Sequence, residues 1–206
     1  AKAAEIDAKL VYLANPDNPM GTWWPAAKIE RMIASMPSDS VLCLDEAYIE
    51  FAPEGTAPQI DPEDPRVVRM RTFSKAYGMA GMRVGYAIAT RRMIGAFNKV
   101  KNHFGMNRIG LVGAAASIED KAWIPQIRAQ VAAARERIGE IAAKNGLTVL
   151  PSATNFVAVD CGRDGDFAKA VLSALIERGV CPRPSPRPPP RSSPPKPDAP
   201  HPAGAR

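Results

Sequence analysis

Short apolar runs alternate along this chain with segments whose apolar residues recur every three or four positions. The runs at residues 11–14, 41–44 and 67–70 are largely apolar and have the length of buried strands. A helix is expected over residues 25–36, and a further strand over residues 84–89. Such strands alternating with helices predict an α/β fold with a mainly parallel sheet that flanking helices cover on both faces.

A second pattern begins near residue 115. Apolar residues from Ile124 to Ile141 recur at spacings of three and four, which predicts a long helix closed by Asn145-Gly146. Strands are expected over residues 147–150 and 155–159, followed by a helix over residues 167–178. Together these elements predict a small α+β domain.

The composition changes at residue 182. Eleven of the last 25 residues are proline, and none is an aliphatic residue larger than alanine. Such a segment cannot bury enough apolar surface to offset its loss of conformational entropy, so we expect it to be disordered or locally polyproline II. If this segment has a function, the alternative is that it serves as a ligand for a proline-binding domain. The expected organisation is a large domain over residues 1–115, a small domain over residues 116–181 and a tail over residues 182–206.

The formal net charge of +6 is concentrated in this tail. Residues 182–206 carry four arginines and one lysine against one aspartate, so the rest of the chain has a net charge of only +2. A nucleic-acid surface needs basic residues gathered on a folded face, with aromatic residues among them. The charge distribution therefore argues against a nucleic-acid partner.

Cysteine spacing and hydropathy argue against several other classes. Cys43, Cys161 and Cys181 are far apart, and the chain has only two histidines, His103 and His201. Zinc sites need more such ligands at close spacing, so we expect no metal and reduced thiols. No apolar run reaches the roughly 18 residues that span a bilayer, and no apolar leader opens the chain. We expect a soluble, cytoplasmic protein without a membrane partner.

The richest chemistry lies in residues 72–85. This segment holds Lys75, the hydroxyl residues Thr72 and Ser74, Arg83 and three glycines. A lysine amine can condense with an aldehyde to a Schiff base, while a guanidinium and neighbouring hydroxyls can hold a phosphate through charge-assisted hydrogen bonds. The glycines allow the backbone to turn tightly around both groups. The segment therefore predicts a site for a phosphate-bearing aldehyde.

Two further motifs precede this segment. One is Asn15-Pro16-Asp17-Asn18-Pro19-Met20-Gly21, and the other, which follows an apolar run, is Asp45-Glu46-Ala47-Tyr48. The three motifs in this order resemble fold-type I pyridoxal-phosphate aminotransferases, and most closely the histidinol-phosphate aminotransferases. The resemblance extends from about residue 10 to about residue 180. It implies part of the pyridoxal-phosphate-binding large domain followed by part of the small C-terminal domain.

The resemblance assigns a role to each central residue. Lys75 matches the lysine that forms the Schiff base with pyridoxal 5'-phosphate and later moves the proton of the substrate. Asp45 matches the partner of the pyridinium nitrogen, although an aspartate at a strand end can instead cap a helix. Tyr48 and Asn18 match the two residues at the phenolic oxygen of the cofactor. Tyr48 could instead be an ordinary half-buried aromatic residue, and Asn18 a turn residue before Pro19.

The remaining site assignments concern the phosphate of the cofactor and the substrate. Thr72, Ser74 and Arg83 match the phosphate-side positions of the family, and a guanidinium suits that role because its planar fork can meet two phosphate oxygens. Asn155 resembles an asparagine on the substrate side of the small domain. An asparagine at a strand start also has many structural uses.

The expected activity follows from the resemblance. It implies transfer of an amino group between an L-amino acid or amino-alcohol phosphate and a 2-oxo acid, as in histidine biosynthesis, by a homodimer. One alternative is a decarboxylase or lyase of the same fold, similar to threonine-phosphate decarboxylase. Another is an inactive remnant or an interaction protein that uses the proline-rich tail.

The sequence also departs from the family at both ends. We find no counterpart of its N-terminal phosphate-binding turn, of the aromatic residue that stacks on the pyridine ring, or of the C-terminal arginine that binds the substrate carboxylate. We therefore expect an incomplete aminotransferase with an altered C-terminal end.

Overall fold

The computed structural model describes residues 2–183. These residues form two compact units that divide between Asp164 and Gly165. The tail expected from residue 182 lies, from residue 184 onward, outside the described residues. The expected boundary between a large and a small domain near residue 115 stays a prediction.

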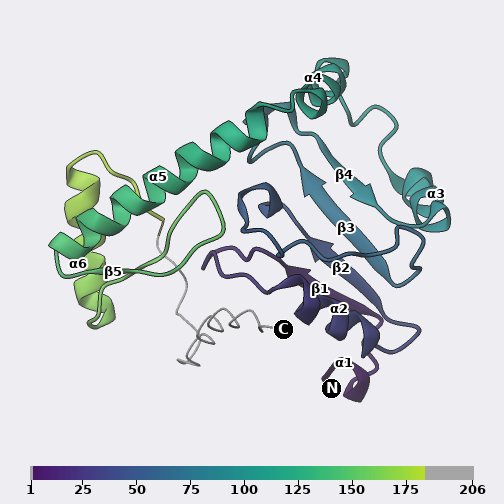
Figure 1. Ribbon diagram of the computed structural model, residues 1–206, viewed down its shortest axis with the longest axis horizontal. Coiled ribbons are helices and arrows are strands. Elements are labelled where there is room, and N and C mark those ends of the chain that lie inside the picture. Colours follow the sequence, from purple (N-terminus) through teal and green to yellow (C-terminus); the bar gives the residue numbers. More distant parts are fainter. Residues whose placement is uncertain (1, 184–206) are drawn as a thin grey trace, which may run out of the picture. The chain divides into compact units, whose positions relative to one another are not determined.

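A four-stranded sheet organises the first unit (Figure 1). Its strands lie in sequence order and are β1 (Leu10–Ala14), β2 (Val41–Asp45), β3 (Val67–Thr72) and β4 (Gly85–Ile88). The first three strands are parallel to one another, and β4 pairs with β3 in the antiparallel direction. The predicted α/β class and mainly parallel sheet are confirmed.

Five helices accompany this sheet within the part of the first unit that the structure describes. They are α1 (Lys2–Glu5), α2 (Ala26–Ala34), α3 (Arg91–Val100), α4 (Arg108–Glu119) and α5 (Trp123–Lys144). Short 3₁₀ helices lie at Ile49–Phe51 and Ala80–Met82. The predicted helices around residues 25–36 and 124–141 correspond to α2 and α5. Asn145 ends α5, and Gly146 follows with a positive φ of 70°.

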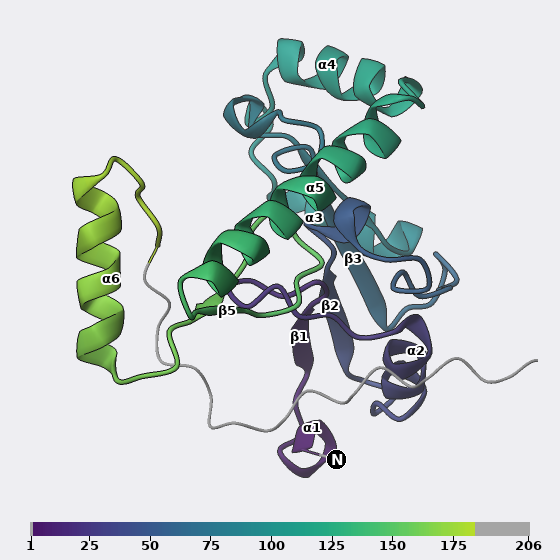
Figure 2. The ribbon, with the colours of Figure 1, turned by 60° about the vertical axis from the view of Figure 1, so that its left-hand side comes forward.

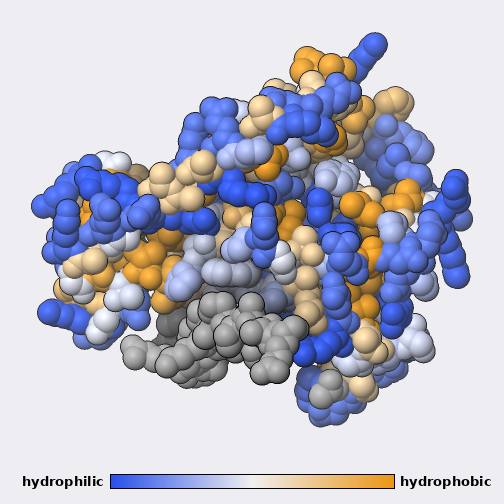
Figure 3. Space-filling view, viewed as in Figure 1, coloured by the Kyte–Doolittle hydropathy of each residue, from blue (hydrophilic) through white to orange (hydrophobic). Residues whose placement is uncertain are grey.

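The sequence pattern did not predict α3 and α4. Each begins at a capping side chain, since Thr90 accepts a hydrogen bond from the backbone N–H of Met93 and Asn107 from that of Gly110. In α4 the buried residues are Gly110 and Ala114, while large apolar side chains are exposed at the surface over this helix (Figure 3). Small residues therefore face the core, which removes the apolar stripe that normally marks a helix.

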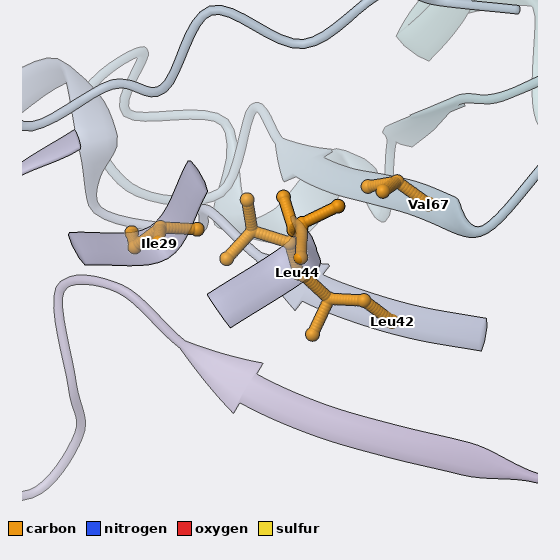
Figure 4. Packing of buried hydrophobic residues seen from close by; sticks show 5 residues of the cluster. Ile29, Leu42, Leu44 and Val67 are labelled. Carbon is orange, nitrogen blue, oxygen red and sulfur yellow. The ribbon is translucent and has the colours of Figure 1, made fainter. Parts of the chain in front are cut away.

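The main core lies between α2 and the parallel strands. Ile29 and Ile33 of α2 pack on Leu42 and Leu44 of β2 and on Val67 of β3. Figures 1 and 2 show α2 beside β1 and β2, and Figure 4 shows Ile29 directed toward Leu44. Leu42 and Leu44 are fully buried. Burial of each such side chain contributes about 1.5–3 kcal/mol, so this cluster fixes β2 and the residues that follow it.

A buried ion network joins the end of β2 to β3. Glu46 is fully buried, and its carboxylate accepts hydrogen bonds from Arg69 Nε at 3.0 Å, Arg69 Nη2 at 2.7 Å and Arg71 Nε at 2.9 Å. Two guanidinium groups thus compensate one buried carboxylate. The network fixes the backbone between Asp45 and Tyr48.

A two-stranded antiparallel sheet, β5 (Thr148–Val149) and β6 (Val159–Asp160), follows α5. The prediction of a strand over residues 155–159 is wrong for most of that span. The hydroxyls of Ser152 and Thr154 both donate to the carbonyl of Phe156, at 2.6 and 3.1 Å. These local side-chain bonds take the place of strand pairing, so Asn155 lies in a loop.

The second unit contains α6 (Gly165–Glu177). This helix matches the one predicted over residues 167–178. Gly179 follows it with a positive φ of 79°, and the N–H of Val180 donates to the carbonyl of Leu175 at 2.9 Å. Within residues 2–183, none of the helices has the length and apolar character needed to cross a bilayer.

Candidate active site

The predicted site residues gather at one edge of the sheet. Because β1, β2 and β3 are parallel, their carboxyl ends meet at the same edge, where open α/β sheets bind their ligands. Asp45 is the last residue of β2. Asn18 follows the end of β1 and Lys75 follows the end of β3. The topology therefore explains why residues so far apart in sequence come together.

A pocket of about 660 Å³ opens at this edge. Four of the predicted residues line it, namely Asn18, Asp45, Tyr48 and Lys75. The other lining residues come from β1, from the loop after it and from the turn after β2: Tyr12, Leu13, Ala14, Pro16, Asp17, Thr22, Trp24 and Ala47. An amine, a carboxylate, a phenol and an amide thus converge on one concave site.

Tyr48 connects Asn18 and Lys75. The side-chain amide of Asn18 donates to the Tyr48 hydroxyl at 3.0 Å. The Nζ atom of Lys75 lies 5.1 Å from the centre of the Tyr48 ring, within the range of a cation–π contact. The Tyr48 side chain is buried, whereas Asn18 is exposed. Tyr48 therefore lies between Asn18 and Lys75 and contacts both of them.

Both oxygens of the Asp45 carboxylate accept hydrogen bonds. Oδ1 accepts from the backbone N–H of Ala47 at 3.0 Å, and Oδ2 accepts from the hydroxyl of Tyr12 at 2.6 Å. The hydrogen bond to Asp45, together with partial desolvation, raises the pKa of Tyr12 to about 12. Tyr12 is the donor in this bond. The sequence reasoning missed Tyr12 as a site residue.

Asn15 shapes the loop that carries Asn18. Its fully buried side chain accepts from the N–H of Trp24 at 2.8 Å and donates to the Trp24 carbonyl at 3.2 Å. Its own N–H donates to the Asp45 carbonyl at 2.9 Å. These bonds close the loop onto the sheet and tie it to β2. The motif's first asparagine is therefore structural.

The predicted phosphate-side residues are close to Lys75 in the sequence, but none of them is among the residues that line the pocket. Thr72 ends β3, and its hydroxyl accepts from the N–H of Ser74 at 3.1 Å and donates to the Val84 carbonyl at 3.3 Å. Arg83 is exposed with a positive φ of 55°, and its guanidinium donates to the Ala80 carbonyl at 2.8 Å. Their role in phosphate binding stays a prediction.

The loop that carries Asn155 packs against the site, although Asn155 itself is exposed and is not among the residues that line the pocket. Phe156 contacts Tyr48 edge to face, with ring centres 5.4 Å apart. The N–H of Ala153 donates to the carbonyl of Gly21 at 2.8 Å. A Cβ atom at Gly21 would lie 2.4 Å from the Ser152 hydroxyl oxygen, so this close approach requires glycine.

Arg135 of α5 also binds the loop that carries Asn155. Its Nη1 donates to the carbonyls of Ser152 at 2.5 Å and Thr154 at 3.0 Å. Desolvation lowers the pKa of this guanidinium, which nevertheless stays charged at neutral pH. No local sequence pattern indicates this contact, because Arg135 lies 17 and 19 positions before its two partners.

Residues 1–191 match the family model "Aminotransferase class I and II". The chain belongs to this family. Aminotransferases of class I and II depend on pyridoxal 5'-phosphate, a phosphate-bearing aldehyde of the kind that the motif around Lys75 predicts. The predicted family is therefore confirmed.

Several members of the family are similar to this chain. Histidinol-phosphate aminotransferase 2 of Pseudomonas aeruginosa is 38% identical over 189 residues, which cover 89% of this chain and 50% of that protein. Histidinol-phosphate aminotransferase of Anaeromyxobacter is 40% identical over 182 residues, which cover 85% of this chain and 49% of that protein. This chain thus spans about half the length of the curated relatives it matches.

A solved structure of the family is also similar. The crystal structure of histidinol-phosphate aminotransferase from Sinorhizobium meliloti, in complex with pyridoxal-5'-phosphate, matches with a TM-score of 0.84 and 48% sequence identity. The match covers 88% of this chain and 50% of that one. The observed sheet and helices are therefore those of fold-type I aminotransferases.

Proposed function

We propose that this chain binds pyridoxal 5'-phosphate at Lys75 and serves aminotransfer between an L-amino acid or amino-alcohol phosphate and a 2-oxo acid. The convergence of Lys75, Asp45, Tyr48 and Asn18 on one pocket carries the proposal. These groups fit the cofactor because they offer an amine for its aldehyde, a carboxylate for its ring nitrogen, and O–H and N–H donors for its phenolic oxygen.

When bound, the cofactor supplies an electron sink that stabilises a carbanion at the substrate α-carbon. In this proposal the amine of Lys75 would hold the cofactor at its aldehyde and, when free, would accept the proton of the substrate α-carbon and return it. Asp45 holds the proton on the ring nitrogen, and Tyr48 with Asn18 orients the phenolic oxygen. Their hydrogen bond at 3.0 Å supports this pairing.

The other proposed roles concern the phosphate and the substrate. Thr72, Ser74 and Arg83 would hold the phosphate through two hydroxyls and one guanidinium. Asn155 would contact the substrate, which is supported by the packing of its loop on Gly21 and Tyr48. This arrangement would place two neutral hydroxyl donors and one charged guanidinium around the dianionic phosphate.

The names of the relatives support a finer proposal. Both curated relatives described above are histidinol-phosphate aminotransferases, so we propose histidinol phosphate as the amino donor, a role in histidine biosynthesis and a cytoplasmic location. We also propose that the active protein is a homodimer, as the family resemblance implies. Cys43, Cys161 and Cys181 are free thiols, which is compatible with a reducing compartment.

One structural neighbour favours a second candidate. A decarboxylase from Sulfurospirillum multivorans matches this chain with a TM-score of 0.69 and 25% sequence identity. The same pocket residues would serve decarboxylation, because both reactions need an electron sink next to the α-carbon. The two candidates differ in which bond to the α-carbon breaks.

The test supplies the protein with pyridoxal phosphate and offers either histidinol phosphate with 2-oxoglutarate, or an O-phospho-amino acid alone. Aminotransfer predicts glutamate from the first mixture, with Lys75→Ala as the inactive control. Carbon dioxide from the second mixture without glutamate from the first would favour the decarboxylase. Turnover that persists in Lys75→Ala would contradict both proposals.

A further inference from the structure

Tyr12 lies on the same face of the sheet as Asp45. In the register of β1 and β2, Tyr12 is opposite Cys43 and Ala14 is opposite Asp45. Side chains two residues apart on a strand point to the same face, so Tyr12 and Asp45 are diagonal neighbours across the strand pair. That separation is within reach of an aromatic side chain, and the Tyr12 hydroxyl meets Asp45 Oδ2 at 2.6 Å.

This hydrogen bond completes the fixation of the carboxylate. The N–H of Ala47 holds Oδ1 at 3.0 Å, and the Tyr12 hydroxyl holds Oδ2. The terminal torsion of an aspartate is broad, so one bond alone would allow the carboxylate plane to rotate. Bonds at both oxygens fix that plane. Each carboxylate oxygen keeps a free lone pair, so Asp45 can still accept a hydrogen bond from a ligand.

From this geometry we propose that Tyr12 is a positioning residue, which orients Asp45 toward the ring nitrogen of a bound pyridine ligand. The inference rests on the proposed function, because it needs a ligand whose ring nitrogen meets Asp45. Tyr12 also lines the pocket in which Asp45 and Lys75 lie. It is a positioning residue because it acts through Asp45.

Two observations distinguish this role from a purely structural one. The Tyr12 side chain is 63% exposed, so its ring adds little to the core. The hydroxyl donates to Asp45 Oδ2 at 2.6 Å, and this bond raises the pKa of Tyr12 to about 12. Because Tyr12 is exposed and its hydroxyl bonds to Asp45, we infer that its main effect is on the orientation of the Asp45 carboxylate.

The test compares two ligands, pyridoxal phosphate and its 1-deaza analogue, in which a C–H replaces the ring nitrogen. Tyr12→Phe should weaken binding of pyridoxal phosphate about tenfold, because a carboxylate that is free to rotate makes a poorer charge-assisted hydrogen bond to the ring nitrogen. Binding of the deaza analogue should be unchanged. Tyr77→Phe removes a phenol that is not among the lining residues of the pocket and should change neither affinity.

Equal losses for both ligands, or no loss for either, would overturn the positioning role. Failure of the unmodified chain to bind pyridoxal phosphate would overturn the proposed function and this inference with it. A ligand-free measurement tests the hydrogen bond itself. In Asp45→Ala, the pKa of Tyr12, followed by NMR of ¹³C-labelled tyrosine, should fall from about 12 toward the usual tyrosine value. An unchanged Tyr12 titration would show that the bond does not form.

Discussion

Asn18 donates its side-chain amide to the hydroxyl of Tyr48 at 3.0 Å, across 30 residues of sequence. The bond joins the loop after β1 to the turn after β2, two segments that meet only because the strands are parallel and adjacent. Phe156 contacts the same tyrosine from a third segment. Tyr48 is therefore the side chain at which three separate segments meet.

The coupling between Asn18 and Tyr48 can be measured. We expect Asn18→Ala and Tyr48→Phe each to weaken binding of pyridoxal phosphate. The double variant should lose less than the sum of the two, by about 0.5–1.5 kcal/mol, because both changes remove the same bond. A double-mutant cycle on the dissociation constant gives this energy. Strictly additive losses would show that the two residues act independently.

Asp45 and Arg83 should affect different properties of the site. Asp45→Asn should reduce turnover more than cofactor affinity, because a partner of the ring nitrogen acts mainly on the electron sink. Arg83→Lys should reduce affinity more than turnover, because lysine cannot make a bidentate contact with phosphate. Titration of the cofactor and initial rates at saturation separate the two effects. The same order of effects in both variants would contradict these assignments.

Glu46 should be important for stability rather than for chemistry. Its carboxylate is fully buried and bonds to Arg69 and Arg71 at 2.7–3.0 Å. Glu46→Ala leaves two guanidinium groups without this partner, so the free energy of unfolding should fall by about 3–5 kcal/mol. Urea denaturation measures the change. Glu54→Ala removes an exposed glutamate and should have little effect. Similar losses in both variants would contradict the importance of the buried network.

Glu50 should make stability depend on pH. Its Oε2 atom is buried and accepts no hydrogen bond from the described residues. Burial raises its pKa, and Glu46 adds to the rise, while the Glu50 backbone, Arg71 and Arg128 oppose it. A raised pKa means that the folded state binds the proton more tightly than the unfolded state. The contribution of this group to stability therefore falls as pH rises from the usual carboxyl range through the raised pKa.

Glu50→Gln should remove this dependence. Between about pH 4 and pH 7, unfolding free energies from urea denaturation should show the variant gaining stability relative to the unmodified chain as pH rises. Glu54→Gln is the matched control, because Glu54 is exposed. Parallel pH profiles for the unmodified chain and Glu50→Gln would show that Glu50 does not titrate with a raised pKa.

The extent to which the sequence predicts this molecule differs from element to element. β2 and α2 were predictable because Leu42, Leu44, Ile29 and Ile33 are apolar, buried and correctly spaced. The family resemblance predicted that Asp45 and Lys75 serve one site, and the structure explains their meeting by the carboxyl edge that parallel strands share. In α4 the small residues Gly110 and Ala114 face the core, so no apolar stripe marked the helix.

Other features depend on partners that no local pattern reveals. The bond from Tyr12 to Asp45 requires the register of β1 against β2. The loop at Asn155 depends on hydrogen bonds from the hydroxyls of Ser152 and Thr154 to a backbone carbonyl. The apolar residues that follow Asn155 instead suggested a strand. Tertiary contacts of this kind override local propensity, so they become visible only in the folded chain.

The central claim is that Lys75 is the covalent attachment point of pyridoxal phosphate. The most direct measurement incubates the chain with the cofactor, reduces the mixture with borohydride and maps the modified lysine by mass spectrometry of peptides. We predict that the label is found on Lys75 and that Lys75→Arg abolishes it while the other lysines stay unlabelled. Label distributed evenly over surface lysines, or label that persists in Lys75→Arg, would contradict the claim.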